Sequence, residues 1–299
     1  MTLHNNDLAG ARVVAVHAHP DDEAITTGGV LADLATRGAD VTVITCTLGE
    51  QGEVIGDTFA QLVNGDADQL GGFRIHELYA SLQILGVRGI HLGGAGCWRD
   101  SGMVGDPAND HPRAFIHSGG AAVEQLVSLL EALRPHLLIT YGPDGGYGHP
   151  DHIRAHEITH EAATRVSEKV GVQRILWAVT DRAELEEGLA AITGIPEGWG
   201  TGSLAAIDDI DLAVELTDTV YATKVESMRA HATQLWIADG STSLTNPVAA
   251  YAQTTQANLK VWALSNLIAQ PIMRHEHYQL GAGMPLPADA TGVLDGLEF

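Results

Sequence analysis

The sequence has few cysteines, few basic residues and no long hydrophobic run. Cys46 and Cys97 are too few for a disulfide framework or a thiolate metal cage. With 16 Lys and Arg against 38 Asp and Glu, the formal net charge is −22, which would repel a phosphate backbone or an anionic membrane surface. Hydrophobic stretches such as Val13–Val16 are far shorter than the roughly 20 residues that span a bilayer. We therefore expect a cytoplasmic protein with no nucleic-acid or membrane partner, and no protein partner is indicated.

Short apolar runs alternate with amphipathic stretches, which is typical of repeated strand–helix units. The runs predict strands at 12–17, 40–45, 89–92, 136–141 and 174–179, and helices at 24–37, 73–85, 121–133, 150–166 and 218–234. This order predicts an α/β fold with a Rossmann-like, mostly parallel sheet, helices on both faces and a smaller C-terminal cap region. The last segment, with Pro271, Pro285 and Pro287, is expected to wrap back over the main domain.

Two His-Pro-Asp strings carry most of the chemical information. HAHPDDE (17–23) follows the first predicted strand, and GHPDH (148–152) follows the fourth. Ligands bind beyond the carboxyl ends of the strands in such sheets, so both strings are expected at one rim. Two imidazoles and a carboxylate suit a hydrolytic zinc and also ferrous iron. Of the adjacent Asp21 and Asp22, one can bind the ion while the other acts as general base on water.

Simpler interpretations compete with a metal site. A His-Pro-Asp string can be only a polar turn and a helix N-terminus, although two of them at matching strand ends favour a shared purpose. HExxH at 156–160 is the zincin peptidase pattern, but Ala163 and Val166 replace the glycine and third histidine of its longer form. His17 is expected beside the metal ligands at most, and His231, His275 and His277 at the surface or in the core. Trp98 fits a sugar platform or a loop anchor equally well.

HAHPDDE with a downstream GHPDH resembles the PIG-L/LmbE family of zinc-dependent GlcNAc de-N-acetylases. The similarity continues through TLGEQGEVIGD, LGGAGCWRDSGM and the EHY near the C-terminus, so it covers most of the chain. It is strongest to the mycothiol-pathway branch, which removes the acetyl group from N-acetylglucosaminyl-inositol. The mycothiol S-conjugate amidase, an alternative in the same family, carries a Lys shortly after DDE. This chain has Ala24–Thr26 there, which favours the deacetylase over the amidase or another GlcNAc de-N-acetylase.

The resemblance implies a role for each matched position. It implies that one zinc, or ferrous iron, per subunit is bound by His19, Asp22 and His152, and that Asp21 is the general base. Further implied roles are oxyanion stabilisation by Tyr147 and His149, orientation of His149 by Asp151, and binding of sugar or inositol hydroxyls by Arg74 and Asp100. Residues 1–180 would then form the metal-binding catalytic core. Residues 181–299 would complete the pocket for a small amino-sugar inositol substrate, as a second region or within one continuous domain.

Overall fold

A seven-stranded sheet forms the centre of the computed structural model, which describes residues 6–299. The strand order is β3-β2-β1-β4-β5-β12-β7. The first five strands are parallel: β1 (Arg12–His17), β2 (Asp40–Thr45), β3 (Arg88–His91), β4 (Leu137–Tyr141) and β5 (Arg174–Val179). The other two, β12 (His275–Gly283) and β7 (Leu212–Glu215), are antiparallel to their neighbours. The predicted mostly parallel α/β sheet is confirmed.

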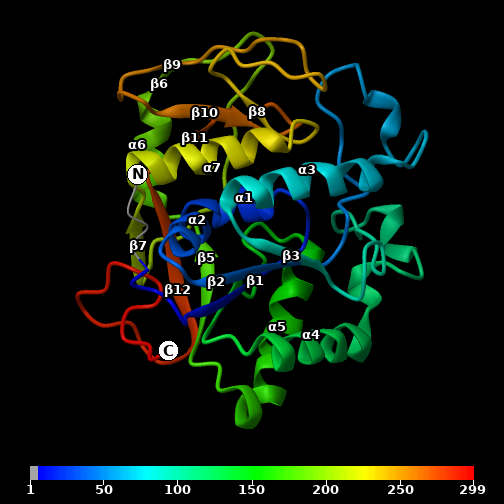
Figure 1. The fold of residues 1–299 in the computed structure, drawn as a ribbon. Coiled ribbons are helices and arrows are strands. Elements are labelled where there is room, and N and C mark those ends of the chain that lie inside the picture. Colours follow the sequence, from blue (N-terminus) through cyan, green and yellow to red (C-terminus); the bar gives the residue numbers. More distant parts are fainter. Residues whose placement is uncertain (1–5) are drawn as a thin grey trace.

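Helices cover both faces of this sheet (Figure 1). One face carries α1 (Asp22–Thr26), α2 (Gly28–Thr36), α3 (Leu70–Leu85) and α7 (Asp218–Ala230), and the other carries α4 (Gly119–Leu133) and α5 (Pro150–Val170). Strand side chains alternate between the two faces of the sheet, and each face has its own hydrophobic core. Val13 and Ala15 of β1 belong to one core, and Val14 and Val16 belong to the other. The sheet is therefore buried on both sides, as its continuous apolar runs require.

Smaller elements form the predicted cap region above α7 (Figure 1). A three-stranded sheet has the order β11-β10-β8, and a two-stranded one pairs β6 with β9. Their bounds are β6 (Ile192–Gly194), β8 (Trp236–Ile237), β9 (Gln253–Thr254), β10 (Lys260–Ala263) and β11 (Gln270–Ile272), with α6 (Arg182–Ala191) beside β11. Short 3-10 helices occur at η1 (Ala60–Leu62), η2 (Pro107–Asp110) and η3 (Phe115–His117). Across residues 6–299, every helix is too short or too polar to cross a bilayer.

The single helix predicted at 24–37 is wrong, because the chain forms α1 and α2 with a break at Thr27. Thr27 has φ −136° and ψ 0°, and its hydroxyl donates to the Glu23 carbonyl oxygen. The following Gly28 and Gly29 have low helix propensity. A side chain at Gly29 would also meet Leu216 at 2.6 Å, so close packing against the loop before α7 requires glycine there. The helix predicted at 218–234 likewise ends early, at Ala230.

The C-terminal segment enters the main sheet as well as covering it. Residues 275–283 form β12 between β5 and β7, which the expectation of a simple wrap did not include. Arg174 of β5 then fixes the tail beyond β12, since its guanidinium donates to the carbonyl oxygens of Met284, Pro285, Val293 and Asp295. Residues after 180 therefore complete the main sheet and also build the cap, and the proposed division at residue 180 stays a prediction.

Candidate metal centre

The carboxyl ends of β1, β2 and β4 lie side by side and place the two His-Pro-Asp strings together. Hydrogen bonding continues past the strands, from the Cys46 N–H to the His17 carbonyl and from the Thr47 N–H to the Ala18 carbonyl. Pro150 is the first residue of α5, and His149 caps the helix by accepting from the Asp151 N–H (3.1 Å). The first turn of α5 therefore presents His152 to the turn that carries His19 and Asp22.

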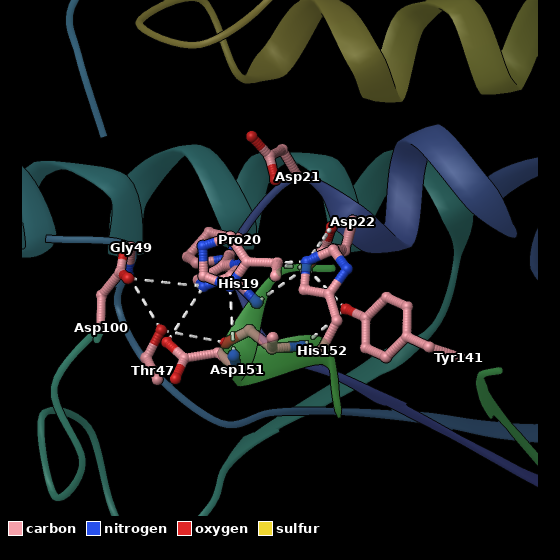
Figure 2. Close-up of polar contacts among 12 residues, drawn as sticks. His19, Pro20, Asp21, Asp22, Thr47, Gly49, Asp100, Tyr141, Asp151 and His152 are labelled. Atoms are coloured by element: carbon pink, nitrogen blue, oxygen red, sulfur yellow. Dashed lines mark hydrogen bonds and ion pairs between the residues drawn. The ribbon is translucent and has the colours of Figure 1, made fainter. Parts of the chain in front are cut away.

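Three residues, His19, Asp22 and His152, form a triangle at this point, and each offers one ligand atom to a metal ion (Figure 2). His19 Nδ1 lies 3.3 Å from His152 Nε2 and 3.3 Å from Asp22 Oδ2, and His152 Nε2 lies 3.4 Å from Asp22 Oδ1. All three residues are buried. Ligand atoms about 2.0–2.1 Å from a tetrahedral zinc are about 3.3–3.4 Å from one another. The donor set and its spacing fit a zinc or ferrous ion.

Hydrogen bonds on the outer nitrogens direct both imidazole lone pairs into this triangle. His152 Nδ1 donates to the Gly145 carbonyl oxygen (3.1 Å), so its Nε2 is unprotonated in the neutral ring. His19 Nε2 faces the carboxylates of Asp151 (3.3 Å) and Asp100 (3.6 Å), which leaves Nδ1 as the ligand atom. Burial lowers the pKa of His152 to about 4 and keeps this ring neutral. The two facing nitrogens are 3.3 Å apart, a distance at which they can share a proton or a metal cation.

Tyr141, the last residue of β4, contacts two members of the triangle and was not singled out in the sequence. Its hydroxyl lies 2.6 Å from Asp22 Oδ2 and 2.7 Å from the Ala18 nitrogen. Its ring stacks on His152 with centroids 4.0 Å apart and planes 16° apart. The signal was positional: once β4 is placed beside β1, a polar residue at the end of β4 must lie next to the HAHPDDE turn.

Asp21 is set apart from the cluster around His19 (Figure 2). Its backbone has φ 111°, an unusual value for a residue other than glycine. Arg74, which is 3 % exposed, donates to Asp21 Oδ2 (3.0 Å), to the Gly49 carbonyl oxygen (2.8 Å) and to the Pro20 carbonyl oxygen. Burial raises the pKa of Asp21 to about 7, although the nearby Arg74 charge opposes this. Such a carboxylate suits general base chemistry near neutral pH.

Glu23, the last residue of HAHPDDE, holds the backbone of the turn at Asp21 through hydrogen bonds. Its Oε2 accepts from the Asp21 N–H (2.9 Å), and its Oε1 contacts Ser81 Oγ (2.6 Å) and His231 Nε2 (2.6 Å). His231, expected at the surface or in the core, is fully buried against this carboxylate. Burial and the Glu23 charge oppose each other on His231, and the net effect raises its pKa. Sequence inspection missed this role because the partners lie on α3 and after α7.

His149 packs against His19, with the ring centroids of His149 and His19 4.6 Å apart. Its Nδ1 accepts from the Asp151 backbone, so the neutral ring carries its proton on Nε2. Burial, together with the charge of His19, lowers the pKa of His149 to about 4. The Asp151 carboxylate bonds to His19 and to the Ser101 N–H (2.9 Å), so Asp151 contacts His149 through its backbone only.

The remaining predicted residues surround this cluster. Tyr147 is 56 % exposed, and its ring centroid lies 5.0 Å from that of His152. Asp100 is buried, and its carboxylate accepts from the backbone N–H groups of Gln51 (3.1 Å) and Gly102 (2.8 Å). The structure therefore brings all nine predicted site residues into one region, where Arg74 and Asp100 already have protein partners.

The other histidines singled out in the sequence have partners away from the triangle. His156 Nδ1 donates to the Tyr141 carbonyl oxygen (2.9 Å), and His160 Nε2 accepts from Trp177 Nε1 (2.9 Å). Neither belongs to a metal-capable group of three within residues 6–299, so HExxH does not form a zincin site in this region. His17 contacts Thr27, while His275 and His277 contact Glu184. Trp98 donates to Gln125 and packs against the core, as a loop anchor does.

Comparisons with known proteins agree with this geometry. A family model described as PIG-L, GlcNAc-PI de-N-acetylase, matches residues 14–163. A protein of Corynebacterium glutamicum (strain R) named 1D-myo-inositol 2-acetamido-2-deoxy-alpha-D-glucopyranoside deacetylase is 85% identical over 98% of this chain and 99% of its own length. A protein of the same name from Corynebacterium diphtheriae is 62% identical over 95% of this chain and 97% of its own length.

Solved structures with similar folds share little sequence. N,N'-diacetylchitobiose deacetylase from Pyrococcus horikoshii aligns with TM-score 0.50 and 20% identity over 78% of this chain and 74% of that one. A 4-carboxy-2-hydroxymuconate hydratase from Pseudomonas putida aligns with TM-score 0.51 and 16% identity over 94% of this chain and all of that one. These likenesses concern the fold, which hosts more than one chemistry. The family model and the nearly full-length relatives establish that the chain belongs to the PIG-L family of GlcNAc-PI de-N-acetylases.

Proposed function

We propose that this protein hydrolyses the N-acetyl group of 1D-myo-inositol 2-acetamido-2-deoxy-α-D-glucopyranoside and releases acetate and glucosaminyl-inositol, in mycothiol biosynthesis. The substrate follows from the name of the relative that is 85% identical over nearly the whole length. The observation that carries the chemistry is the triangle of His19, Asp22 and His152 with the buried carboxylate of Asp21 beside it. This combination is what metal-assisted amide hydrolysis requires.

His19, Asp22 and His152 hold one zinc or ferrous ion per subunit in this proposal. A cation held there would supply polarisation of the acetyl carbonyl and a lowered pKa for the attacking water. The protein's part is to aim the two imidazoles inward, which the contacts of His152 with Gly145 and of His19 with Asp151 achieve. The buried setting also strengthens each charge interaction by excluding bulk water.

Asp21 takes the proton of the attacking water on its carboxylate and returns it to the leaving amine. Its pKa of about 7 places both protonation states within reach near neutral pH. Arg74 holds the carboxylate through Oδ2, so the base is already oriented before substrate binds. The neutral His149 donates its Nε2 proton as a hydrogen bond to the oxyanion, and the Tyr147 hydroxyl is a second donor.

Arg74 and Asp100 are the proposed contacts for sugar or inositol hydroxyls. The Arg74 guanidinium already donates to Asp21 and to two backbone carbonyl oxygens, so a substrate hydroxyl would be a further hydrogen-bond partner. The Asp100 carboxylate already accepts from two backbone N–H groups, so a substrate hydroxyl would be its third donor. We therefore expect Asp100, at the base of the Gly93–Gly120 loop, to accept from a hydroxyl without moving. Arg74 couples substrate binding to the orientation of the base, because one guanidinium touches both.

The first test is release of primary amine from the inositol substrate by the metal-loaded protein. Asp21→Asn keeps the shape of the side chain but cannot accept the proton, so kcat should fall by about 10²–10⁴-fold. The zinc content should not change, because Asp21 lies outside the ligand triangle. Asp66→Asn, at an exposed position, is the matched control and should retain wild-type kcat.

Three results would contradict the proposal. The first is wild-type protein that binds zinc and still releases no amine from this substrate. The second is normal turnover by the Asp21→Asn variant, and the third is faster hydrolysis of a mycothiol S-conjugate than of the inositol substrate. The last result would assign the amidase activity instead. Metal analysis of His19→Ala beside wild type separates loss of the ion from loss of the base.

A further inference from the structure

We propose that Tyr141 is a positioning residue for the metal centre, fixing Asp22 through its hydroxyl and His152 through its ring. This inference rests on the proposed metal-dependent function. The side chain is 4 % exposed and lies at the end of β4, opposite the HAHPDDE turn (Figure 2). Tyr141 contacts two of the three ligand residues, Asp22 and His152, but is not itself one of the ligand residues.

The direction of the hydrogen bonds follows from the donors available. The Ala18 N–H can only donate, so it uses a lone pair of the Tyr141 oxygen (2.7 Å). The single hydroxyl proton is then committed to Asp22 Oδ2 at 2.6 Å, a charge-assisted bond to a carboxylate. The chain is therefore Ala18 N–H to Tyr141 hydroxyl to Asp22, with no alternative acceptor among these partners.

This chain of hydrogen bonds fixes how the two oxygens of Asp22 face the imidazoles. Oδ2 also accepts from the His19 N–H (2.9 Å), so two donors occupy it. Oδ1 is the oxygen 3.4 Å from His152 Nε2 and has neither of these donors. Tyr141 thereby holds the carboxylate in a rotamer in which Oδ1 faces His152 Nε2 and Oδ2 faces His19 Nδ1 (3.3 Å), before an ion binds.

The ring and the backbone of Tyr141 are fixed independently of its hydroxyl. The ring stacks on His152 at 4.0 Å, which limits rotation of that imidazole. The carbonyl oxygen accepts from His156 Nδ1 (2.9 Å), a histidine of the HExxH pattern one turn beyond His152. The first histidine of that pattern therefore supports the end of β4 and, through it, the metal ligands.

The test is the zinc affinity of Tyr141→Phe, measured by competition with a chromophoric chelator. Loss of an outer partner of a metal ligand weakens binding by about 10–100-fold, and we expect a rise of this size in the zinc Kd. Tyr141→Leu removes the stack as well and should bind more weakly still. Tyr221→Phe is the matched control, because Tyr221 is also 4 % exposed and its hydroxyl also accepts a backbone N–H (Lys260, 3.2 Å) and donates to an oxygen (Ile272, 2.9 Å).

A purely structural role for Tyr141 predicts a different pattern. Both phenylalanine variants would then lose similar stability in urea, and neither would change its zinc Kd. An unchanged Kd for Tyr141→Phe overturns the inference. Should this variant be too unstable for competition, the zinc-induced shift of its urea midpoint reports the same Kd. Failure of the proposed function is distinct, since wild type itself would then bind no zinc or release no amine.

Discussion

The Glu23 carboxylate holds the backbone of the proposed base in a strained conformation. A residue other than glycine at positive φ costs of the order of 1–3 kcal/mol, and Asp21 has φ 111°. The Asp21 N–H donates to Glu23 Oε2, while Ser81 and His231 hold Oε1. Asp21 is thus oriented from both sides, by Arg74 on its carboxylate and by Glu23 on its backbone.

Glu23→Gln tests this anchor. An amide nitrogen cannot accept a hydrogen bond, so one of the buried donors around Glu23 loses its partner, at a cost of about 1–3 kcal/mol. We expect kcat to fall with little change in KM, because Asp21 acts on the reacting atoms. Urea unfolding and steady-state kinetics measure the two effects.

Ser81→Ala is the matched control for this prediction. It removes one donor to Glu23 and leaves the bond to the Asp21 N–H in place, so stability should fall by about 1 kcal/mol while kcat stays near wild type. Equal kcat values for the two variants would show that Glu23 is structural only.

Some residues of the candidate site could be predicted from the sequence and others could not. The two strings that carry His19, Asp22 and His152 were predictable as neighbours, because they follow two strands whose ends must meet in a parallel sheet, while the choice of these three as ligands came from the family resemblance. Tyr141 and the partner of Glu23 were not, since Tyr141 contacts Asp22 across 119 positions and His231 contacts Glu23 across 208. Such pairs depend on which elements pack together, and no local pattern encodes that.

Elements were predictable where one physical signal dominated. Strands β1, β2 and β4 are apolar runs buried on both faces, and all five parallel strands were placed within about a residue or two. β12 was missed because HEHY is polar, and its Glu276 and His277 are buried by pairing rather than by apolarity. The break at Thr27 was missed because the apolar pattern continues through it, while the Thr27 hydroxyl is held by the Glu23 carbonyl oxygen and by His17 from β1.

Glu276 joins β12 to the start of α2 and to α7. Its carboxylate accepts from the N–H groups of Gly29 and Val30 (both 2.8 Å) and from Lys224 Nζ (2.6 Å). The side chains of Lys224 and Glu276 are 6% and 2% exposed. A buried charge left without its partner destabilises a protein by about 3–5 kcal/mol, so Glu276→Gln should cost this much in urea unfolding.

Lys224→Met in the Glu276→Gln background is the informative second variant. It removes the unpaired ammonium, so the double variant should be more stable than Glu276→Gln alone. The remaining loss then measures the two bonds to the α2 N-terminus. A double variant as unstable as the single one would mean that the helix contacts, and not the ion pair, carry the stability.

The whole molecule carries an excess of negative charge that its surface ion pairs do not neutralise. Pairs such as Arg37–Asp7 and Lys169–Glu131 are exposed and contribute little each. The net charge of −22 leaves the folded chain repelling itself. The proposed substrate is neutral, so this field is not expected to steer it into the site, and the acidic surface must be explained by solubility instead.

Salt dependence of thermal stability tests which electrostatic term dominates. Raising the ionic strength from about 0.01 M to about 0.15 M with NaCl shortens the screening length from about 30 Å to about 8 Å and weakens long-range repulsion more than close ion pairs. Relief of roughly 1 kcal/mol of repulsion raises the Tm of a chain of this size by about 2–4 °C, and we expect a rise of this order in the metal-loaded protein.

Sucrose of equal osmolality is the control, because it stabilises by exclusion from the protein surface and not by screening of charges. A Tm that falls with NaCl would mean that the surface ion pairs outweigh the repulsion. A Tm that rises equally in both solutes would mean that screening has no part in it.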